Sequence, residues 1–190
     1  MGRQHIIPAQ VQTFINPIIS LPVYLLIAYL PPISVGFLLG LVQGLNFALV
    51  YLLARQLLSG THFDFMTSAM RNMIPLIAAI IGVTAPMFVS EIGATFGDNF
   101  TSIFVLAALL LVLRKPSQHL CLYPVIGGFL IGIAAGLKLT NMIFLLALIG
   151  CGWWYEYRFR RAITAILLFL IGASLALFVF QGYWSWHLFR

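Results

Sequence analysis

The stretch ISVGFLLGLVQGLNFALVYLLA, residues 33–54, decides the class of fold. It contains no charged side chain, and Arg55 ends it. A helix needs about 20 apolar residues to cross the hydrocarbon core of a bilayer, and this run is long enough. We therefore predict that residues 33–54 form a membrane-spanning α-helix.

The composition of the whole chain predicts an integral membrane protein. Of its 190 residues, 62% are hydrophobic and 7% are charged, with a mean hydropathy of +1.06. A soluble domain has about 25% charged residues, so that class is excluded. A membrane β-barrel would show alternating hydrophobicity in segments of about 10 residues, which the long apolar runs lack. We predict a single all-α domain over residues 1–190, a polytopic transmembrane helical bundle.

Other apolar runs extend this bundle to about six spans. A run at residues 18–30 is short and contains Pro22, so we expect it to form an interfacial or re-entrant helix. Pro86 should kink or end the second span just before an acidic loop. The predicted spans cover residues 33–54, 73–90, 99–113, 120–137, 142–154 and 162–180.

The basic residues predict the orientation of these spans. If successive spans alternate in direction, one side receives Arg55, Arg71, Arg114, Lys115, Arg158, Arg160 and Arg161, whereas the other receives Arg3, Lys138 and Arg190. Because loops rich in lysine and arginine stay cytoplasmic, the first side is predicted to be cytoplasmic. We expect a multi-pass protein of the cytoplasmic (inner) membrane of a bacterium.

The same alternation predicts which loops share the outer face. Three of them are QTFINP (12–17), SEIGATFGDN (90–99) and GLKLTN (136–141). The net charge of +6 comes from short basic clusters between spans, so a nucleic-acid partner is excluded and membrane lipids are the expected contacts.

Glycines recur every fourth residue in two of the spans, forming one stripe on each helix. Such stripes let a second helix approach closely, so we interpret both as packing surfaces. The stripes are Gly36, Gly40 and Gly44 in the first span and Gly128, Gly132 and Gly136 in the fourth. Gln43 and Asn46 add polar groups to the first span and should face protein.

The outer loops hold the candidate functional side chains Glu91, Asp98 and Lys138. A charge at bilayer depth is costly unless it is paired or used. Glu91 follows a predicted helix C-terminus, where the dipole disfavours a carboxylate. It therefore needs a cation, for which Lys138 is the candidate. This set is interpreted either as a structural ion pair or as a ligand site with Glu91 and Asp98 as candidate catalytic carboxylates.

Several of these residues also have simpler interpretations. Asp98 could cap the helix that follows it. Lys138 could bind a phosphate, or it could extend to the interface as a lysine near a helix end does. Thr140 and Asn141 could hold a head group or satisfy backbone groups where the helix breaks. The four histidines show no metal-ligand spacing, and we predict no metal site and no cofactor.

Three segments together resemble the membrane glycosyltransferases of the GT-C superfamily, in particular family 87, which uses polyprenyl-phosphate-mannose. These are QTFINPIISLPVYLL, APMFVSEIGATFGDNFTSIFVLAALLL and GGFLIGIAAGLKLTNMIFLLAL, and the resemblance covers most of residues 8–150. It implies transfer from a lipid-linked sugar phosphate at the outer face. It also implies that Glu91, Asp98 and Lys138 line the donor site, with Lys138 near the phosphate.

The chain differs from that family in two respects. Members of that family are similar to one another in having an acidic residue in an earlier outer loop, which is thought to act as the base. In this chain nothing acidic precedes Asp64. The chain also ends after one further span, so we expect a relative shortened at both ends. The favoured hypothesis is a non-catalytic accessory subunit that packs with other transmembrane subunits. The alternatives are an active polyprenyl-phosphate-sugar-dependent glycosyltransferase and, less favoured, a small transporter.

Overall fold

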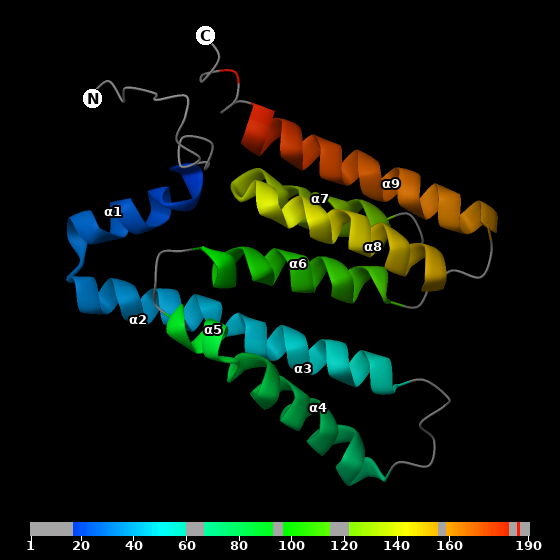
Figure 1. Ribbon diagram of the computed structural model, residues 1–190, viewed down its shortest axis with the longest axis horizontal. Helices are drawn as coiled ribbons and strands as arrows, with labels where there is room; N and C mark the ends of the chain where they lie inside the picture. The colour runs from blue at the N-terminus through cyan, green and yellow to red at the C-terminus, as the bar shows by residue number, and fades with distance from the viewer. Residues whose placement is uncertain are drawn as a thin grey trace.

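The protein is all-helical throughout the part that the computed structural model describes, which confirms the predicted class (Figure 1). The described residues are 17–59, 67–92, 97–114, 122–155, 159–182 and 186. The outer loop QTFINP therefore lies outside them except for Pro17, as do residues 93–96 of SEIGATFGDN.

The N-terminal part contains a short helix followed by one long, nearly continuous helix. The elements are η2 (Pro17–Ile19), α1 (Leu21–Tyr29), α2 (Pro32–Gln43) and α3 (Leu45–Leu58). Helix α1 ends before the Pro31-Pro32 pair, because proline excludes helical geometry from the residue before it. Helices α2 and α3 meet at Gly44. Helix α3 continues past Arg55 to Leu58, so the helix extends beyond the predicted end at residue 54.

The central part follows the predicted proline break. Its elements are α4 (Ser68–Val83), α5 (Pro86–Ser90) and α6 (Asp98–Val112). Thr67 caps α4, since its hydroxyl oxygen accepts a hydrogen bond from the backbone N–H of Met70 at 3.4 Å. Helix α4 ends at Val83 and Pro86 begins α5, which confirms the break before the acidic loop. Helix α4 begins at Ser68, earlier than the predicted start at residue 73.

The C-terminal part contains a second break, at GLKLTN. Its elements are α7 (Leu122–Leu137), η4 (Leu139–Asn141), α8 (Met142–Tyr155), α9 (Phe159–Leu177) and the π-helical turn η5 (Phe178–Gly182). Lys138 is extended, with φ −144° and ψ 107°, and separates α7 from η4 as predicted.

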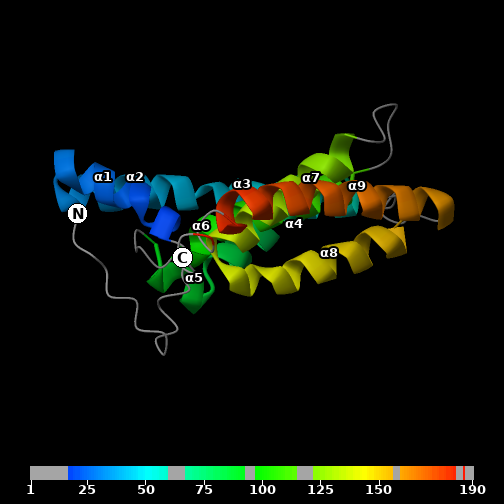
Figure 2. The ribbon, with the colours of Figure 1, turned by 90° about the horizontal axis from the view of Figure 1, so that it is seen from above.

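The core lies where α7 packs against α9 and α6. It is built from small and branched residues, among them Ala108, Ile131, Ala134, Leu148 and Phe169. Glycines allow the close approach of α7 to α9. A Cβ added at Gly128 would overlap the backbone of Phe169, and one at Gly136 would lie 2.8 Å from the Cβ of Phe180. Figure 2 separates α7 from α8, which overlap in Figure 1.

The stripe on α2 is in a different situation from the stripe on α7. A Cβ added at Gly36 would meet no atom within 4 Å, and one at Gly40 would meet only the Ile92 side chain, at 3.6 Å. At Gly44 the nearest atoms, at 3.2 and 3.3 Å, belong to the backbone of α2 itself. A packing role for this stripe therefore stays a prediction.

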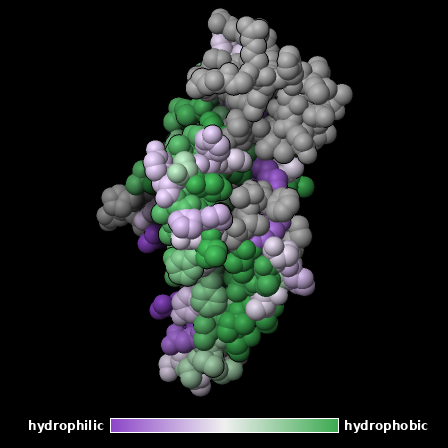
Figure 3. Space-filling model, turned by 90° about the vertical axis from the view of Figure 1, so that its left-hand side faces the viewer, coloured by the Kyte–Doolittle hydropathy of each residue, from purple (hydrophilic) through white to green (hydrophobic). Residues whose placement is uncertain are grey.

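Many large hydrophobic side chains are exposed, as expected for a protein surrounded by lipid, and green hydrophobic areas are visible on the face that Figure 3 shows. Two helices, Pro32–Leu58 and Ala162–Gly182, are long and apolar enough to cross a membrane. Four shorter apolar helices, α4, α6, α7 and a segment covering η4 and most of α8, have 10–17 residues each. The number of crossings stays a prediction.

The helices from α3 to α9 run back and forth, so their ends gather at two opposite ends of the bundle (Figure 1). One end, at the left of Figure 1, holds α5 and the junctions around Asp98 and Lys138. The other end holds Arg55 in the last turn of α3 and Arg114 just after α6.

Candidate functional site: an acidic cavity at the loop end

The ammonium of Lys138 forms an ion pair with the carboxylate of Asp98. The helix break produces this contact. The backbone N–H of Lys138 still bonds to the carbonyl of Ala134 at 3.0 Å, and the Asn141 side-chain amide donates to the same carbonyl at 3.0 Å. The extended Lys138 backbone then directs its side chain to the start of α6. The sequence suggested Glu91 as the partner of Lys138, and this pairing was wrong.

Asp98 is the first residue of α6 and does not cap it. The N-cap position belongs to Gly97, and no side chain caps the helix. Gly97 has φ 78°, in the left-handed region that favours glycine. The capping role considered for Asp98 is therefore wrong, because its carboxylate turns to Lys138 instead. Asp98 still lies in the first turn, where the helix dipole favours negative charge.

Glu91 lies directly after α5 and is only 8% exposed. Among the residues that the structure describes, none donates a hydrogen bond to its carboxylate. Burying a carboxylate without such donors is unfavourable. Glu91 is thus a largely buried acidic residue at the C-terminal end of α5.

Glu91 and Asp98 line one cavity of about 440 Å³. Polar side chains of α3, α6 and η4 share its wall, namely Asn46, Asn99, Ser102 and Asn141. Apolar side chains such as Val50, Val105 and Phe144 form the rest of the lining. Lys138 and Thr140 are not part of this wall. Lys138 joins it only through Asp98, and Thr140 is exposed.

Asn46 holds one side of the cavity together. It is 2% exposed, and its side-chain amide donates to the backbone carbonyl of Asn99 at 2.7 Å. The Ser102 hydroxyl shares its one hydrogen between the amide oxygen of Asn46 at 3.0 Å and the backbone carbonyl of Asn99 at 2.9 Å. These bonds tie α3 to the first turns of α6. Gln43 is also 2% exposed, so the prediction that both polar residues face protein is confirmed.

Sequence reasoning found Asn46 but not its partners in the cavity wall. Asn99 and Ser102 are three residues apart, which places them on one face of α6. Two polar residues at that spacing, at the start of an apolar run, indicate a polar face on the first turns of the helix, and this pattern could have identified Asn99 and Ser102 as lining residues. Within the described part of the chain, no group of three His, Cys, Asp or Glu side chains could hold a metal ion.

The comparisons with known proteins agree with the resemblance found in the sequence. The family model of glycosyltransferase family 87 matches residues 14–189. No curated protein and no solved structure matches the chain.

Proposed function

Because the chain belongs to glycosyltransferase family 87, we propose that it transfers a sugar from a polyprenyl-phosphate donor, with Glu91 as the general base. One observation carries the proposal. Glu91, a residue that is 8% exposed, lines a cavity of about 440 Å³ that also has amide and hydroxyl groups in its wall, and no described residue donates a hydrogen bond to its carboxylate. An unpaired buried carboxylate is suited to accept a proton from a bound hydroxyl.

In the proposed reaction, the Glu91 carboxylate takes the proton of an acceptor hydroxyl. The hydroxyl oxygen then forms a bond to the anomeric carbon of the donor sugar. The bond between that carbon and the phosphate oxygen breaks, and its electron pair leaves with the polyprenyl phosphate. General-base assistance of this kind contributes about 10²–10⁴-fold to a rate.

Lys138 has an electrostatic role in this proposal. Glu91 and Asp98 both line the cavity, and two carboxylates would repel the phosphate of the donor. The Lys138 ammonium beside Asp98 offsets one of these charges at the edge of the cavity. An ammonium also stabilises the charge that develops on the leaving phosphate. In this proposal Lys138 neutralises the charge of Asp98 and positions the donor phosphate, whereas Glu91 accepts the proton of the acceptor hydroxyl.

The test is sugar transfer by the purified full chain in lipid nanodiscs. Release of polyprenyl phosphate from polyprenyl-phosphate-mannose is measured with a panel of hydroxyl acceptors. We expect Glu91→Gln to lower the rate by at least about 100-fold, and the matched change Asp98→Asn to lower it much less. Transfer by Glu91→Gln at the wild-type rate would overturn the proposed role of Glu91.

The open glycine stripe on α2 favours a second candidate function. Gly36, Gly40 and Gly44 line a cavity of about 700 Å³ together with Phe37, Leu41, Leu45 and Ile92. A helix of another transmembrane subunit fits such a surface, as in the accessory-subunit hypothesis. Native mass spectrometry of a mild detergent extract separates the two functions. Stoichiometric partner subunits, combined with no transfer by the isolated chain, would favour the accessory role.

A further inference from the structure

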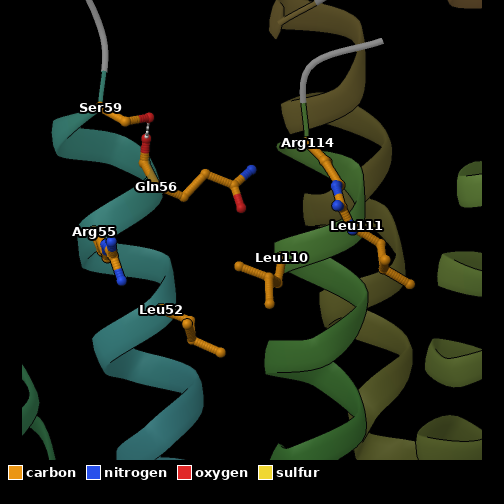
Figure 4. A pocket seen from close by; sticks show the side chains of 7 residues that line it. All are labelled: Leu52, Arg55, Gln56, Ser59, Leu110, Leu111 and Arg114. Atoms are coloured by element: carbon orange, nitrogen blue, oxygen red, sulfur yellow. Dashed lines mark hydrogen bonds between the residues drawn. The ribbon is translucent and has the colours of Figure 1, made fainter. Parts of the chain in front are cut away.

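A third cavity lies between the C-terminal ends of α3 and α6, at the end of the bundle opposite to α5 (Figure 4). Its volume is about 470 Å³. Figure 4 shows the side chains of α3 on one side and those of α6 on the other. The polar groups that line it are Arg55, Gln56, Ser59 and Arg114.

Two guanidinium groups give this cavity a positive charge. Arg55 lies in the last turn of α3, and Arg114 follows the C-terminus of α6. The guanidinium carbon of Arg114 lies 5.0 Å from the ring centroid of Tyr123, a cation–π contact that restrains it. Of the acidic residues in the described part of the chain, Glu91 and Asp98, neither lines this cavity.

Gln56 points a hydrogen-bond donor into the same space (Figure 4). Its side-chain nitrogen is buried, and it has no hydrogen-bond partner among the described residues. Ser59 is held close by, since its hydroxyl donates to the backbone carbonyl of Gln56 at 2.7 Å. A buried amide N–H without an acceptor is unfavourable, so a ligand oxygen at this position would stabilise the site.

The part of the cavity wall that lies toward the middle of the bundle is apolar. Leu52 lies one turn of α3 before Gln56, and Leu110 and Leu111 lie one turn of α6 before Arg114. Cationic groups therefore occupy the helix ends, and leucines continue toward the middle of the bundle. This order matches a ligand with an anionic head and a hydrocarbon chain.

We propose that this cavity binds an anionic phospholipid. Its phosphate oxygens accept hydrogen bonds from Arg114 and the Gln56 amide, Arg55 adds positive charge at the edge of the cavity, and an acyl chain lies against Leu52, Leu110 and Leu111. Free phosphate would use the cations but not the leucines. The basic residues of the sequence predict that this end is cytoplasmic, where anionic lipids attract Lys and Arg. The site is independent of the proposed transfer reaction at the other end.

The test is native mass spectrometry of the full chain in detergent, titrated with phosphatidylglycerol. Phosphatidylcholine with the same acyl chains tests for net charge, and inorganic phosphate tests for the head group alone. We expect phosphatidylglycerol to bind at least about tenfold more tightly than phosphatidylcholine, because charge-assisted hydrogen bonds to arginine are strong. Equal binding of the two lipids would overturn the proposal.

Variants assign the binding to these residues. Arg55→Gln and Gln56→Leu should each weaken phosphatidylglycerol binding by about tenfold. Gln56→Leu keeps the volume of the side chain and removes an unpaired donor, so it remains informative if Arg55→Gln folds poorly. The control Arg71→Gln removes a cation in the first turn of α4, outside this cavity, and should change binding by less than about twofold.

Two results would contradict the assignment. If Arg71→Gln weakens binding as much as Arg55→Gln, the attraction belongs to the whole basic end rather than to the cavity. If inorganic phosphate binds with the same dependence on Arg55 and Gln56 and displaces the lipid, the ligand is phosphate and not a phospholipid.

Discussion

The Lys138 ammonium donates a hydrogen bond to the Asp98 carboxylate across 40 residues of chain. This contact joins the break after α7 to the first residue of α6, beside the cavity that Glu91 lines. It decides which of the two acids is paired. Asp98 is paired with the Lys138 cation, whereas Glu91 lines the cavity without a cation among the described residues.

The Lys138–Asp98 pair should add little to stability. The side chain of Lys138 is 27% exposed and that of Asp98 is 43% exposed, so water screens their attraction. A double-mutant cycle of Lys138→Met and Asp98→Asn, measured by unfolding in detergent, should give a coupling of about 0.2–1 kcal/mol. A coupling above about 3 kcal/mol would mean that the pair is buried by lipid or by another subunit.

Glu91→Gln should separate stability from activity. The change removes a buried charge that no described residue pairs, so the melting temperature should stay the same or rise. The transfer rate should fall as proposed above. A melting temperature that falls by many degrees would show that the carboxylate has a structural partner, and the loss of activity would then reflect unfolding.

Asn46→Ala should destabilise the bundle. It removes the bonds to the Asn99 carbonyl and the Ser102 hydroxyl from a side chain that is 2% exposed. We expect a loss of about 1–3 kcal/mol in the free energy of unfolding. Ser102→Ala is the matched control, because it removes one of these bonds and leaves the Asn46–Asn99 bond intact. It should cost about 0.5–1.5 kcal/mol, and a cost as large as that of Asn46→Ala would contradict the central role of Asn46.

The two glycine stripes should respond differently to alanine. A Cβ at Gly128 would overlap the backbone of α9, so Gly128→Ala should cost about 1–3 kcal/mol or more in stability. Gly36 faces open space, so Gly36→Ala should be neutral, or stabilising by up to about 1 kcal/mol from helix propensity alone. Thermal unfolding of the isolated chain in detergent measures both. A large cost for Gly36→Ala in that setting would show that a second copy of the chain covers the stripe.

Local signals in the sequence predicted most of the elements. Pro86 begins a new helix where expected, because proline restricts the backbone of the residue before it. The GLKLTN segment also breaks a helix where expected, at Lys138. The ends were less accurate. Helix α3 runs to Leu58 and α4 begins at Ser68, because a helix can continue past the edge of its apolar run.

By itself the sequence determined the all-α class, the breaks at Pro86 and at GLKLTN, and the family. Hydropathy and proline geometry are properties of consecutive residues, so a sequence contains them fully. Only the tertiary structure decided that Lys138 pairs with Asp98, that Gly128 packs closely while Gly36 does not, and that Asn99 and Ser102 join Glu91 around one cavity. These outcomes depend on where the ends of α3, α6 and α7 meet. That geometry follows from the packing of whole helices and is not a property of any one segment.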